Sequence, residues 1–466
     1  MGEKIRYLLK NIGLMTLSNF ASKIISFLLV PLYTSALSTT EYGTYDLYTT
    51  TAFLLIPVLS LCASDAVIRF ALDEHEDKSE VLSIGLLLFV RATIIIAFLF
   101  AVNWALNIVP LFNEYPGFFI LYYATCLLSD ILTQFARGLE RIFDVAVAGV
   151  LSSLVTVCLN ILLLIVVPMG LTGYFAASCA SFGITIVYLA LRLHIWRYVT
   201  IPRSKTLKRR MQRYSAPLIF NQIGWWINNA SDRYVVTMIC GAAANGVYSV
   251  AYKIPSLLLV FQTIFNQAWT LSVVKEVESN DTSFITKVYS VYNCGMVLVC
   301  TVLVALVKVV ARILFANEFY AAWQYAPILL VSVVFSSLSI LLGGIFTATK
   351  DSSVIARTTV IGAVVNLAIS LLLTPAIGPM GAAVATLVSY IVVWALRLID
   401  AYRAVGFKTP LTRDICSYGV LLLQSGAFLV WDGPALYLTQ CVAVVGVFIL
   451  YLREIRAIAL RAMRRA

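Results

Sequence analysis

Apolar residues run along this chain in long blocks that short polar connections separate. A hydrocarbon core about 30 Å thick needs roughly 20 apolar residues in a helix to cross it. Fourteen blocks approach or exceed that length, so the pattern predicts an all-α polytopic membrane protein with about 14 transmembrane helices. The predicted spans are 13–36, 45–70, 82–108, 117–137, 144–167, 172–194, 215–238, 246–271, 287–311, 325–347, 353–374, 379–399, 412–431 and 434–452.

The span predicted at 215–238 differs from the others because polar side chains recur along one helical face, at i, i+4, i+7, i+8 and i+11. These side chains are Asn221, Trp225, Asn228, Asn229 and Asp232. A charge at the centre of a bilayer costs about 3 kcal/mol or more, so this face meets protein or water. It is either a polar seam between packed helices or the wall of a wet cavity, and the ionisable Arg233 and Lys253 favour the cavity.

Basic residues are distributed unevenly over the connections. With a cytoplasmic N-terminus, the inner segments hold 28 of the 34 lysine and arginine residues, and the outer connections hold only Arg312. The positive-inside rule then places both termini in the cytoplasm. The net charge of +11 therefore reflects topology and attraction to anionic lipid, and no nucleic-acid partner is expected.

Composition narrows the class of protein further. The chain of 466 residues is 61% hydrophobic and 12% charged, which excludes a soluble multidomain enzyme. Lys4, Arg6 and Lys10 precede the first span, but that span is too long for a signal peptide and is expected to be retained. The nine cysteines form no CxxC motif, and only His75 and His194 could assist a metal. We therefore expect no disulfide framework, no metal and no cofactor.

Two parts of the chain repeat each other. Gly43 and Tyr45 match Gly246 and Tyr248 at an offset of 203. At offsets of 205 to 208, Asn160, Pro168, Gly170, Gly173 and Arg192 match Asn366, Pro375, Gly378, Gly381 and Arg397. An ordered series of matches indicates duplication. Because each copy has six spans, we predict two six-helix lobes in parallel repeat around a central cavity, plus two extra C-terminal helices.

A basic stretch that contains Pro202 divides the two copies and is too polar to insert into a membrane. The predicted organisation is an N-terminal lobe at 1–196, a basic cytoplasmic linker at 197–213, a C-terminal lobe at 214–404, and two additional helices with a basic cytoplasmic tail at 405–466.

Five segments carry a resemblance to a known family. They are LSTTEYGTYDLY (37–48), WWINNASDRYVV (225–236), NGVYSVAYKIPSLL (245–258), FYAAWQYAPILL (319–330) and TTVIGAVVNLAISLLLTPAIGPMGAAVATLVSY (358–390). In these segments the chain resembles the Wzx-like oligosaccharide flippases of polysaccharide biosynthesis. That branch belongs to the multidrug/oligosaccharidyl-lipid/polysaccharide exporter superfamily, which also holds the lipid II flippases and the multidrug and toxin extruders.

The resemblance implies a transporter rather than an enzyme. It would work by alternating access in a bacterial inner or plasma membrane and flip a polyprenyl-diphosphate-linked oligosaccharide from the cytoplasmic to the outer leaflet. Besides this substrate and the lipid bilayer, other polysaccharide assembly proteins are candidate partners. Family members place cations on the first helices of each lobe to receive the diphosphate, and Lys23 and Lys253 occupy such places.

The physical properties of the side chains extend this hypothesis to a full set of site residues. Cations suit a diphosphate, amides suit sugar hydroxyls, and aromatic rings stack on sugar faces. The expected diphosphate-binding residues are Lys23, Arg91, Arg233 and Lys253. The expected sugar-contacting cavity residues are Asn19, Asn221, Trp225, Asn228, Asn229, Tyr248, Tyr252, Asn266 and Gln267, with Gln262 and Trp269 as further candidates. The carboxylates available for ion coupling are Asp65, Asp130 and Asp232.

Two other functions stay open on the sequence. A multidrug or cation extruder of the same fold would need an acidic cavity, whereas the expected cavity holds four cations against three carboxylates. A membrane glycosyltransferase or polysaccharide polymerase would present a catalytic acid or base, typically on a long outer loop. All the predicted outer connections are short, which disfavours an enzyme.

Overall fold

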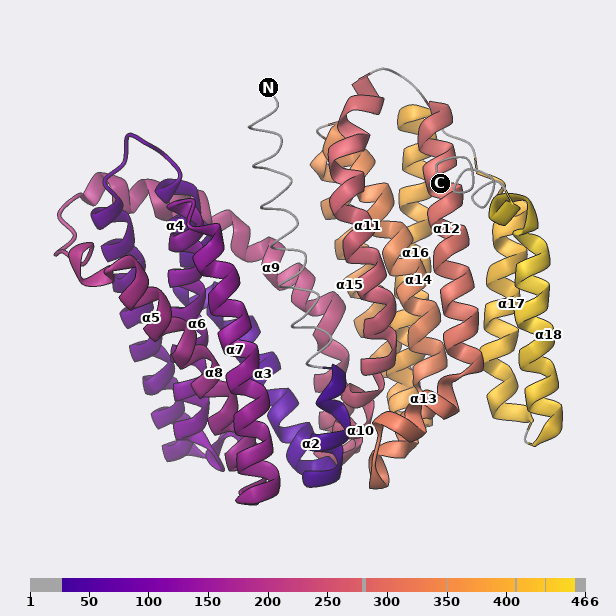
Figure 1. Cartoon of the computed structure of the whole chain (residues 1–466), viewed down its shortest axis with the longest axis horizontal. Helices are drawn as coiled ribbons and strands as arrows, with labels where there is room; N and C mark the ends of the chain where they lie inside the picture. The colour runs from indigo at the N-terminus through magenta and orange to yellow at the C-terminus, as the bar shows by residue number, and fades with distance from the viewer. Residues whose placement is uncertain (1–26, 279–281, 350, 407–408, 432, 457–466) are drawn as a thin grey trace. The chain divides into compact units, whose positions relative to one another are not determined.

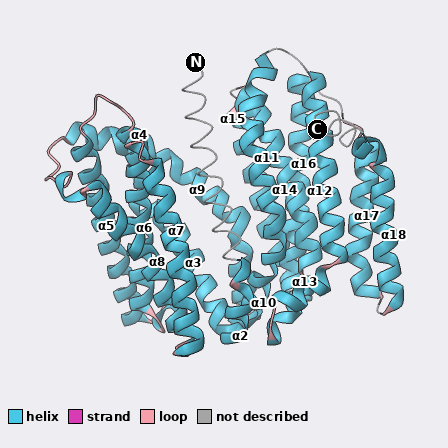
Figure 2. Ribbon diagram, in the orientation of Figure 1, coloured by secondary structure: helices cyan, strands magenta, loops and turns pink. Residues whose placement is uncertain are grey.

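The computed structural model describes residues 27–278, 282–349, 351–406, 409–431 and 433–456. In these ranges the chain is helical with no β-strand, as the prediction of an all-α protein requires (Figure 1; Figure 2). It forms two compact units, Met1–Trp226 (unit 1) and Ile227–Ala466 (unit 2).

Unit 1 is a bundle whose helices surround one aromatic core. Tyr48, Phe119, Phe135 and Phe175 are fully buried in that core. α6 packs on α4, α5 and α8, and so lies at the centre of the bundle. The helices are α2 (Val30–Ala36), α3 (Thr39–Ser60), α4 (Ala63–Ala71), α5 (Lys78–Leu106), α6 (Pro116–Gly138), α7 (Ile142–Ile161), α8 (Gly170–Leu193) and the first part of α9 (Lys205–Cys240).

Unit 2 is organised around α14 (Ala326–Ala348), which packs on α11, α12 and α16. Its strong hydropathy reflects contact with protein, because 83% of its most apolar window is buried. The unit also contains the end of α9, α10 (Ala242–Ala251), α11 (Lys253–Glu278), α12 (Thr282–Ala305), α13 (Val307–Leu314), α15 (Ser352–Ile377), α16 (Pro379–Val405), α17 (Leu411–Val430) and α18 (Pro434–Leu450).

The described part of the chain has eight helices that are long and apolar enough to cross a membrane, or nine if α3 and α4 count as one bent span. The predicted count of fourteen is therefore not confirmed. Most of the span predicted at 13–36 lies outside the described residues. α9 begins at Lys205, ten residues before the predicted start of its span, because lysine, arginine, methionine and glutamine form helices readily. The span predicted at 246–271 divides into α10 and α11 at Tyr252.

The span predicted at 45–70 is broken in the structure. α3 and α4 meet at an angle of 57°, and Leu61 and Cys62 between them both adopt left-handed backbone conformations. Pro57 weakens the end of α3, because proline has no backbone N–H to donate. Hydropathy alone did not reveal this break, since apolar residues continue through it.

The predicted duplication is visible in matching backbone details of the two units. Gly170 is the first residue of α8 and Gly378 directly precedes α16, the last helix of each copy, and both have positive φ values, +57° and +63°. Gly173 and Gly381 let the backbone of the preceding helix approach closely. A Cβ atom on Gly173 would lie 2.8 Å from the Leu163 carbonyl oxygen, and one on Gly381 would lie 2.5 Å from the Leu373 carbonyl carbon.

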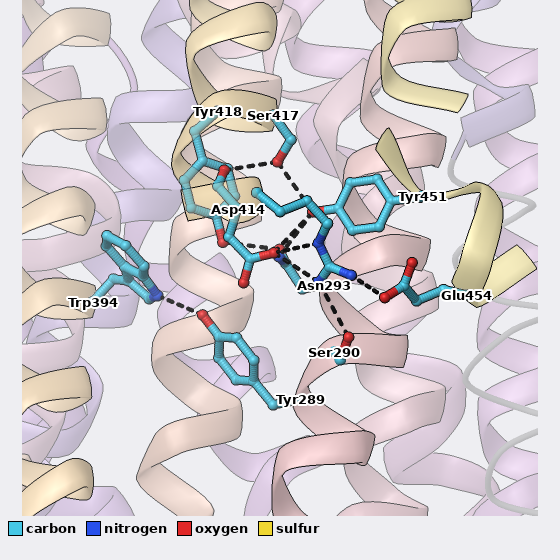
Figure 3. A network of polar contacts seen from close by, with 10 residues as sticks. Tyr289, Ser290, Asn293, Trp394, Asp414, Ser417, Tyr418, Tyr451 and Glu454 are labelled. Carbon is cyan, nitrogen blue, oxygen red and sulfur yellow. Dashed lines mark hydrogen bonds and ion pairs between the residues drawn. The ribbon is translucent and has the colours of Figure 1, made fainter. Parts of the chain in front are cut away.

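The two C-terminal helices, α17 and α18, pack on the rest of unit 2 through a buried polar network (Figure 3). The Tyr418 hydroxyl donates to Asn293 on α12 at 2.9 Å, and the Asn293 amide donates to the Tyr451 hydroxyl at 3.1 Å. Asp414 is fully buried and pairs with Arg413, which also pairs with Glu454. Because lipid offers polar groups no alternative partners, this network fixes α17 and α18 on α12.

The close approach at the two matched glycines yields a stability prediction. Gly381→Ala and Gly173→Ala force backbone atoms apart, and overpacking of this kind costs about 1–3 kcal/mol. We expect each variant to melt at a lower temperature than the wild type when purified in detergent. Gly446→Ala in α18 is the matched control, because its Cβ meets no atom within 4 Å. Equal melting temperatures for all three variants would contradict the steric argument.

Candidate functional site

Asp232 lies at the centre of a polar cluster inside unit 2. Its side chain is buried, and its Oδ2 accepts hydrogen bonds from the hydroxyls of Tyr248 at 2.7 Å and Tyr252 at 2.6 Å. Thr386 on α16 donates to the same oxygen at 3.4 Å. These hydroxyls supply hydrogen bonds without adding a positive charge, so the negative charge of the ionised carboxylate is solvated but not neutralised by them.

The cluster continues onto α15. The Asn366 amide donates to Thr386 Oγ1 at 3.3 Å. Asn366, Ser370 and Thr374 follow one another at i, i+4 and i+8, so they share one helical face, and all three are buried. Asn366 Oδ1, Ser370 Oγ and Thr374 Oγ1 have no hydrogen-bond partner among the described residues. This face therefore offers buried oxygen atoms to a further polar group.

The two predicted cations of unit 2 lie near this cluster along the chain and are half-buried. Arg233 follows Asp232 directly, and its guanidinium carbon lies 5.5 Å from the centre of the Tyr252 ring. Lys253 is the first residue of α11 and follows Tyr252. Tyr252 thus connects the predicted ion-coupling carboxylate to a predicted diphosphate-binding cation, because it donates a hydrogen bond to Asp232 and its ring contacts the Arg233 guanidinium.

The amides predicted on α9 divide between packing and exposure. Asn228 is buried and donates to the Thr359 carbonyl at 3.2 Å, so it serves the polar seam that the sequence left as one interpretation. Asn229 is exposed and accepts from Tyr390 at 3.1 Å. Asn221 and Trp225, in the unit 1 part of α9, are exposed in that unit. One helical face therefore holds both packed and accessible polar groups.

The remaining candidates of α11 are placed as follows. Asn266 is half-buried, whereas the Gln267 side chain lies outside the described atoms. Gln262 accepts from Ser337 at 3.1 Å, and Trp269 donates to the Leu341 carbonyl at 3.0 Å, so both are bound to α14. Asn19 and Lys23 lie outside the described residues.

The two carboxylates predicted in unit 1 come together. Asp65 on α4 lies close enough to Asp130 on α6 for their charges to interact. The Gln134 amide donates to Asp130 at 3.4 Å. The alternative interpretation of Asp65 as a local partner of Arg69 is not seen, since neither residue forms an ion pair within the described chain.

Arg91 has a structural partner that the sequence did not reveal. Its side chain is exposed, and one Nη atom donates to the Leu59 carbonyl at 3.3 Å. The break after Ser60 ends α3 there, so this carbonyl lies in the last turn, where intrahelical donors are missing. Arg91 therefore stabilises the end of α3.

Arg397, near the end of the span predicted at 379–399, is a buried cation outside the predicted set of site residues. It is 6% exposed in unit 2. Its guanidinium donates to the Ser339 carbonyl at 2.8 Å and to the hydroxyls of Thr358 and Thr359 at 3.0 and 2.9 Å. No carboxylate pairs with it within the described residues. The only sequence signal was its match with Arg192 in the first copy.

The described residues contain no group of three or more histidine, cysteine or carboxylate side chains that could hold a metal ion. Unit 2 offers groups that can bind a polar ligand. It combines a solvated carboxylate, buried oxygen atoms and cationic side chains in helices that are otherwise apolar.

Comparisons with known proteins identify the family of the chain and proteins that share its fold. The family model for polysaccharide biosynthesis proteins matches residues 8–270, which is more than half of the chain. A curated relative, the probable low-salt glycan biosynthesis flippase Agl15 of Haloferax volcanii, is 26% identical over 195 residues. That match covers 40% of this chain and 40% of the relative.

Solved structures share the fold at low identity. The lipid II flippase MurJ in an inward closed conformation is 14% identical, with a TM-score of 0.69, and the match covers 94% of this chain and 99% of MurJ. An inward-facing multidrug resistance MATE family transporter is 15% identical, with the same TM-score, over 82% of this chain and 94% of the transporter. A MOP superfamily transporter from Pyrococcus furiosus is 16% identical, with a TM-score of 0.54, over 85% of this chain and 94% of that protein.

The apolar helices show a multi-pass membrane protein, and the solved structures show that its fold is that of MurJ and the MATE transporters. With the family model matched over more than half of its length, the chain belongs to the polysaccharide biosynthesis protein family.

Proposed function

We propose that this protein flips a polyprenyl-diphosphate-linked oligosaccharide from the cytoplasmic to the outer leaflet of a bacterial cell membrane, by alternating access. Its membership of the polysaccharide biosynthesis family is the observation that carries the proposal. The name of the relative from Haloferax volcanii, a glycan biosynthesis flippase, supports it. Both termini are proposed to be cytoplasmic, and the partners are the lipid-linked sugar, the bilayer and other assembly proteins.

The physical problem is to move a charged headgroup across hydrocarbon. A diphosphate cannot enter lipid unaided, because its charges would lose their hydration. In the proposal, Lys23, Arg91, Arg233 and Lys253 receive it. Lysine acts as a compact charge, and arginine donates two parallel hydrogen bonds. Outward movement of an anion is also favoured by about 2.3 kcal/mol per charge for each 100 mV of inside-negative potential.

The sugar part would meet amides and aromatic rings. Exposed Asn221, Trp225 and Asn229 on α9 are suited to contact it. Three further candidates, Asn228, Tyr248 and Gln262, form hydrogen bonds within unit 2. They would hold the helices of the site in place and would not contact the sugar. The polyprenyl tail would stay in the bilayer throughout.

Asp232 is the proposed ion-coupling residue. Its carboxylate is buried among hydroxyls, and α15 presents further buried oxygen atoms with no described donor. A proton or a small cation would neutralise this carboxylate and so change the electrostatic balance next to Arg233. Asp65 and Asp130 are the corresponding candidates in unit 1.

A multidrug or cation extruder is the second candidate, because the MATE transporter and MurJ match the fold with equal TM-scores. A cationic drug would require an excess of carboxylates. In unit 2, Asp400, Asp414 and Glu454 are in ion pairs with arginines. The half-buried cations Arg233 and Lys253 lie near Asp232 along the chain and outnumber it, which favours an anionic cargo.

Removal of the proposed diphosphate cations tests the cargo. We expect Lys23→Ala and Lys253→Ala to insert normally but to abolish surface polysaccharide, with lipid-linked precursor accumulating in the inner leaflet. Arg233→Lys should keep partial function, because it preserves charge but not the paired hydrogen bonds. The measurements are membrane abundance, surface polysaccharide and precursor level in a strain that lacks the native gene.

Lys308→Ala is the control for that experiment. It removes a cation of the short helix α13 whose ammonium lies 4.4 Å from the centre of the Trp323 ring, away from the proposed site residues in sequence. It should export at close to the wild-type rate. Wild-type export by both Lys23→Ala and Lys253→Ala would refute the diphosphate site.

Neutralisation of Asp232 tests the coupling. We expect Asp232→Asn in liposomes to transport at a rate that no longer responds to an imposed proton or sodium gradient. Tyr252→Phe keeps the ring beside Arg233 but removes one hydrogen bond to the carboxylate, so its response to the gradient should only weaken. An unchanged response in Asp232→Asn would exclude Asp232 as the coupling residue while leaving the cargo hypothesis intact.

A further inference from the structure

A basic pocket of about 370 Å³ opens at one end of unit 1, where α7 begins and α8 ends. That volume falls within the roughly 300–1,000 Å³ typical of small-molecule sites. Three of its side chains carry guanidinium groups. The lining residues are Leu139, Arg141, Arg192, Leu193, His194, Arg197 and Tyr198. None of them belongs to the site proposed for transport.

A buried carboxylate positions two of the three arginines. Asp144, in the first turn of α7, has a side chain only 4% exposed. It accepts from Arg141 Nε at 2.7 Å and from Arg192 Nε at 3.0 Å. The Tyr188 hydroxyl donates to the same carboxylate at 3.3 Å. Asp144 therefore holds both guanidinium groups through their Nε atoms. The two arginine side chains stay about half exposed, so their other N–H donors remain accessible from the pocket.

The arrangement leaves an excess of donors and positive charge. Each arginine has five N–H donors, and Asp144 engages only the Nε of Arg141 and of Arg192. Arg197 is exposed and forms no ion pair within the described chain. The pocket therefore has three guanidinium groups, and the carboxylate of Asp144 compensates only one of their positive charges. Such a set suits a phosphate group, which arginine binds through paired hydrogen bonds.

The end of α8 does not oppose an anion as a bare helix C-terminus would. The His194 N–H donates to the Leu191 carbonyl at 3.4 Å and so satisfies an acceptor in the last turn of α8. The start of α7 brings the positive end of a helix dipole to the same pocket, since Arg141 is the residue just before that helix.

Exposed apolar side chains near the pocket indicate the level at which the pocket lies in the membrane. Val187 and Leu191 lie one turn apart on α8, and both are more than half exposed. Trp196 is also exposed, and its ring contacts that of His194 edge-on at 5.2 Å. Tryptophan is enriched at the level of lipid headgroups, with acyl chains beside the adjacent apolar surface. The predicted positive-inside orientation places this end in the cytoplasmic leaflet.

We propose that the basic pocket binds the phosphate of an anionic phospholipid of the cytoplasmic leaflet, with the acyl chains along Val187 and Leu191. Arg141, Arg192 and Arg197 donate to the phosphate, and Asp144 is a positioning residue for the first two. This lipid site is distinct from the cargo site, and it does not depend on the identity of the cargo.

Native mass spectrometry of the full chain in detergent tests this site. The probes are phosphatidylglycerol and phosphatidylcholine with identical acyl chains. We expect the wild type to retain phosphatidylglycerol in preference, and Arg197→Gln to bind it about five-fold more weakly, because one arginine contact is lost. Arg197 is exposed and makes no ion pair with a described residue, so this variant should fold normally.

Arg203→Gln is the matched control, because Arg203 is exposed in the same basic segment but does not line the pocket. It should bind phosphatidylglycerol as the wild type does. Equal loss in both variants would show diffuse attraction and overturn the proposal. Equal retention of phosphatidylcholine, or complete displacement of the lipid by millimolar inorganic phosphate, would also overturn it.

Asp144→Asn separates positioned donors from net charge. The substitution removes one negative charge, which makes the net charge of the pocket more positive by one. It also removes the carboxylate that holds Arg141 and Arg192. We expect weaker binding of phosphatidylglycerol despite the added charge. Tighter binding would show that charge alone attracts the lipid and would overturn the assignment of a built site.

Discussion

Hydrocarbon offers no hydrogen bonds, and this constraint governs the structure. A polar group that the chain carries into a membrane helix costs free energy unless it finds a hydrogen-bond partner within the protein. Asn293, Tyr418 and Tyr451 satisfy one another across three helical segments. Asn160 turns back to the Thr156 carbonyl of its own helix. The helices are therefore held together by polar contacts that water would weaken, while apolar packing fills the space between those contacts.

The two most informative buried carboxylates meet this constraint in different ways. Asp144 lies near the end of its helix and is paired with two arginines, so its charge is compensated. Asp232 is surrounded by hydroxyls, so its hydrogen bonds are satisfied while its charge is not cancelled by those donors. The first arrangement is suited to holding arginines in place. The second leaves a charge that a cation could neutralise, which is why ion coupling is proposed there.

Much of the fold could be predicted from the sequence, because long apolar blocks have few alternatives to helices in a membrane. The duplication was also readable, since the backbone needs glycine at Gly173 and Gly381 for close approach and at Gly170 and Gly378 for a left-handed turn. The break at Leu61 and Cys62 was not readable, because neither residue signals a left-handed conformation. Pro57 was the only hint.

The candidate site was predictable only in part, for a related reason. The spacing on α9 identified Asp232 and its polar neighbours, since periodicity is a local property of the sequence. The spacing could not separate Asn228, which packs on α15, from Asn229, which is exposed. That distinction depends on Thr359 and Tyr390, more than a hundred residues away. The burial of Arg397 could not be predicted either, because Ser339, Thr358 and Thr359 surround it only after folding.

The surroundings of Arg397 set a standing electrostatic bias within unit 2. A guanidinium held by uncharged oxygen atoms has its hydrogen bonds satisfied, but its field is not cancelled, and low-dielectric surroundings let that field reach further than it would in water. The second copy of the repeat is thus electrically unlike the first, where Asp144 compensates the matching arginine.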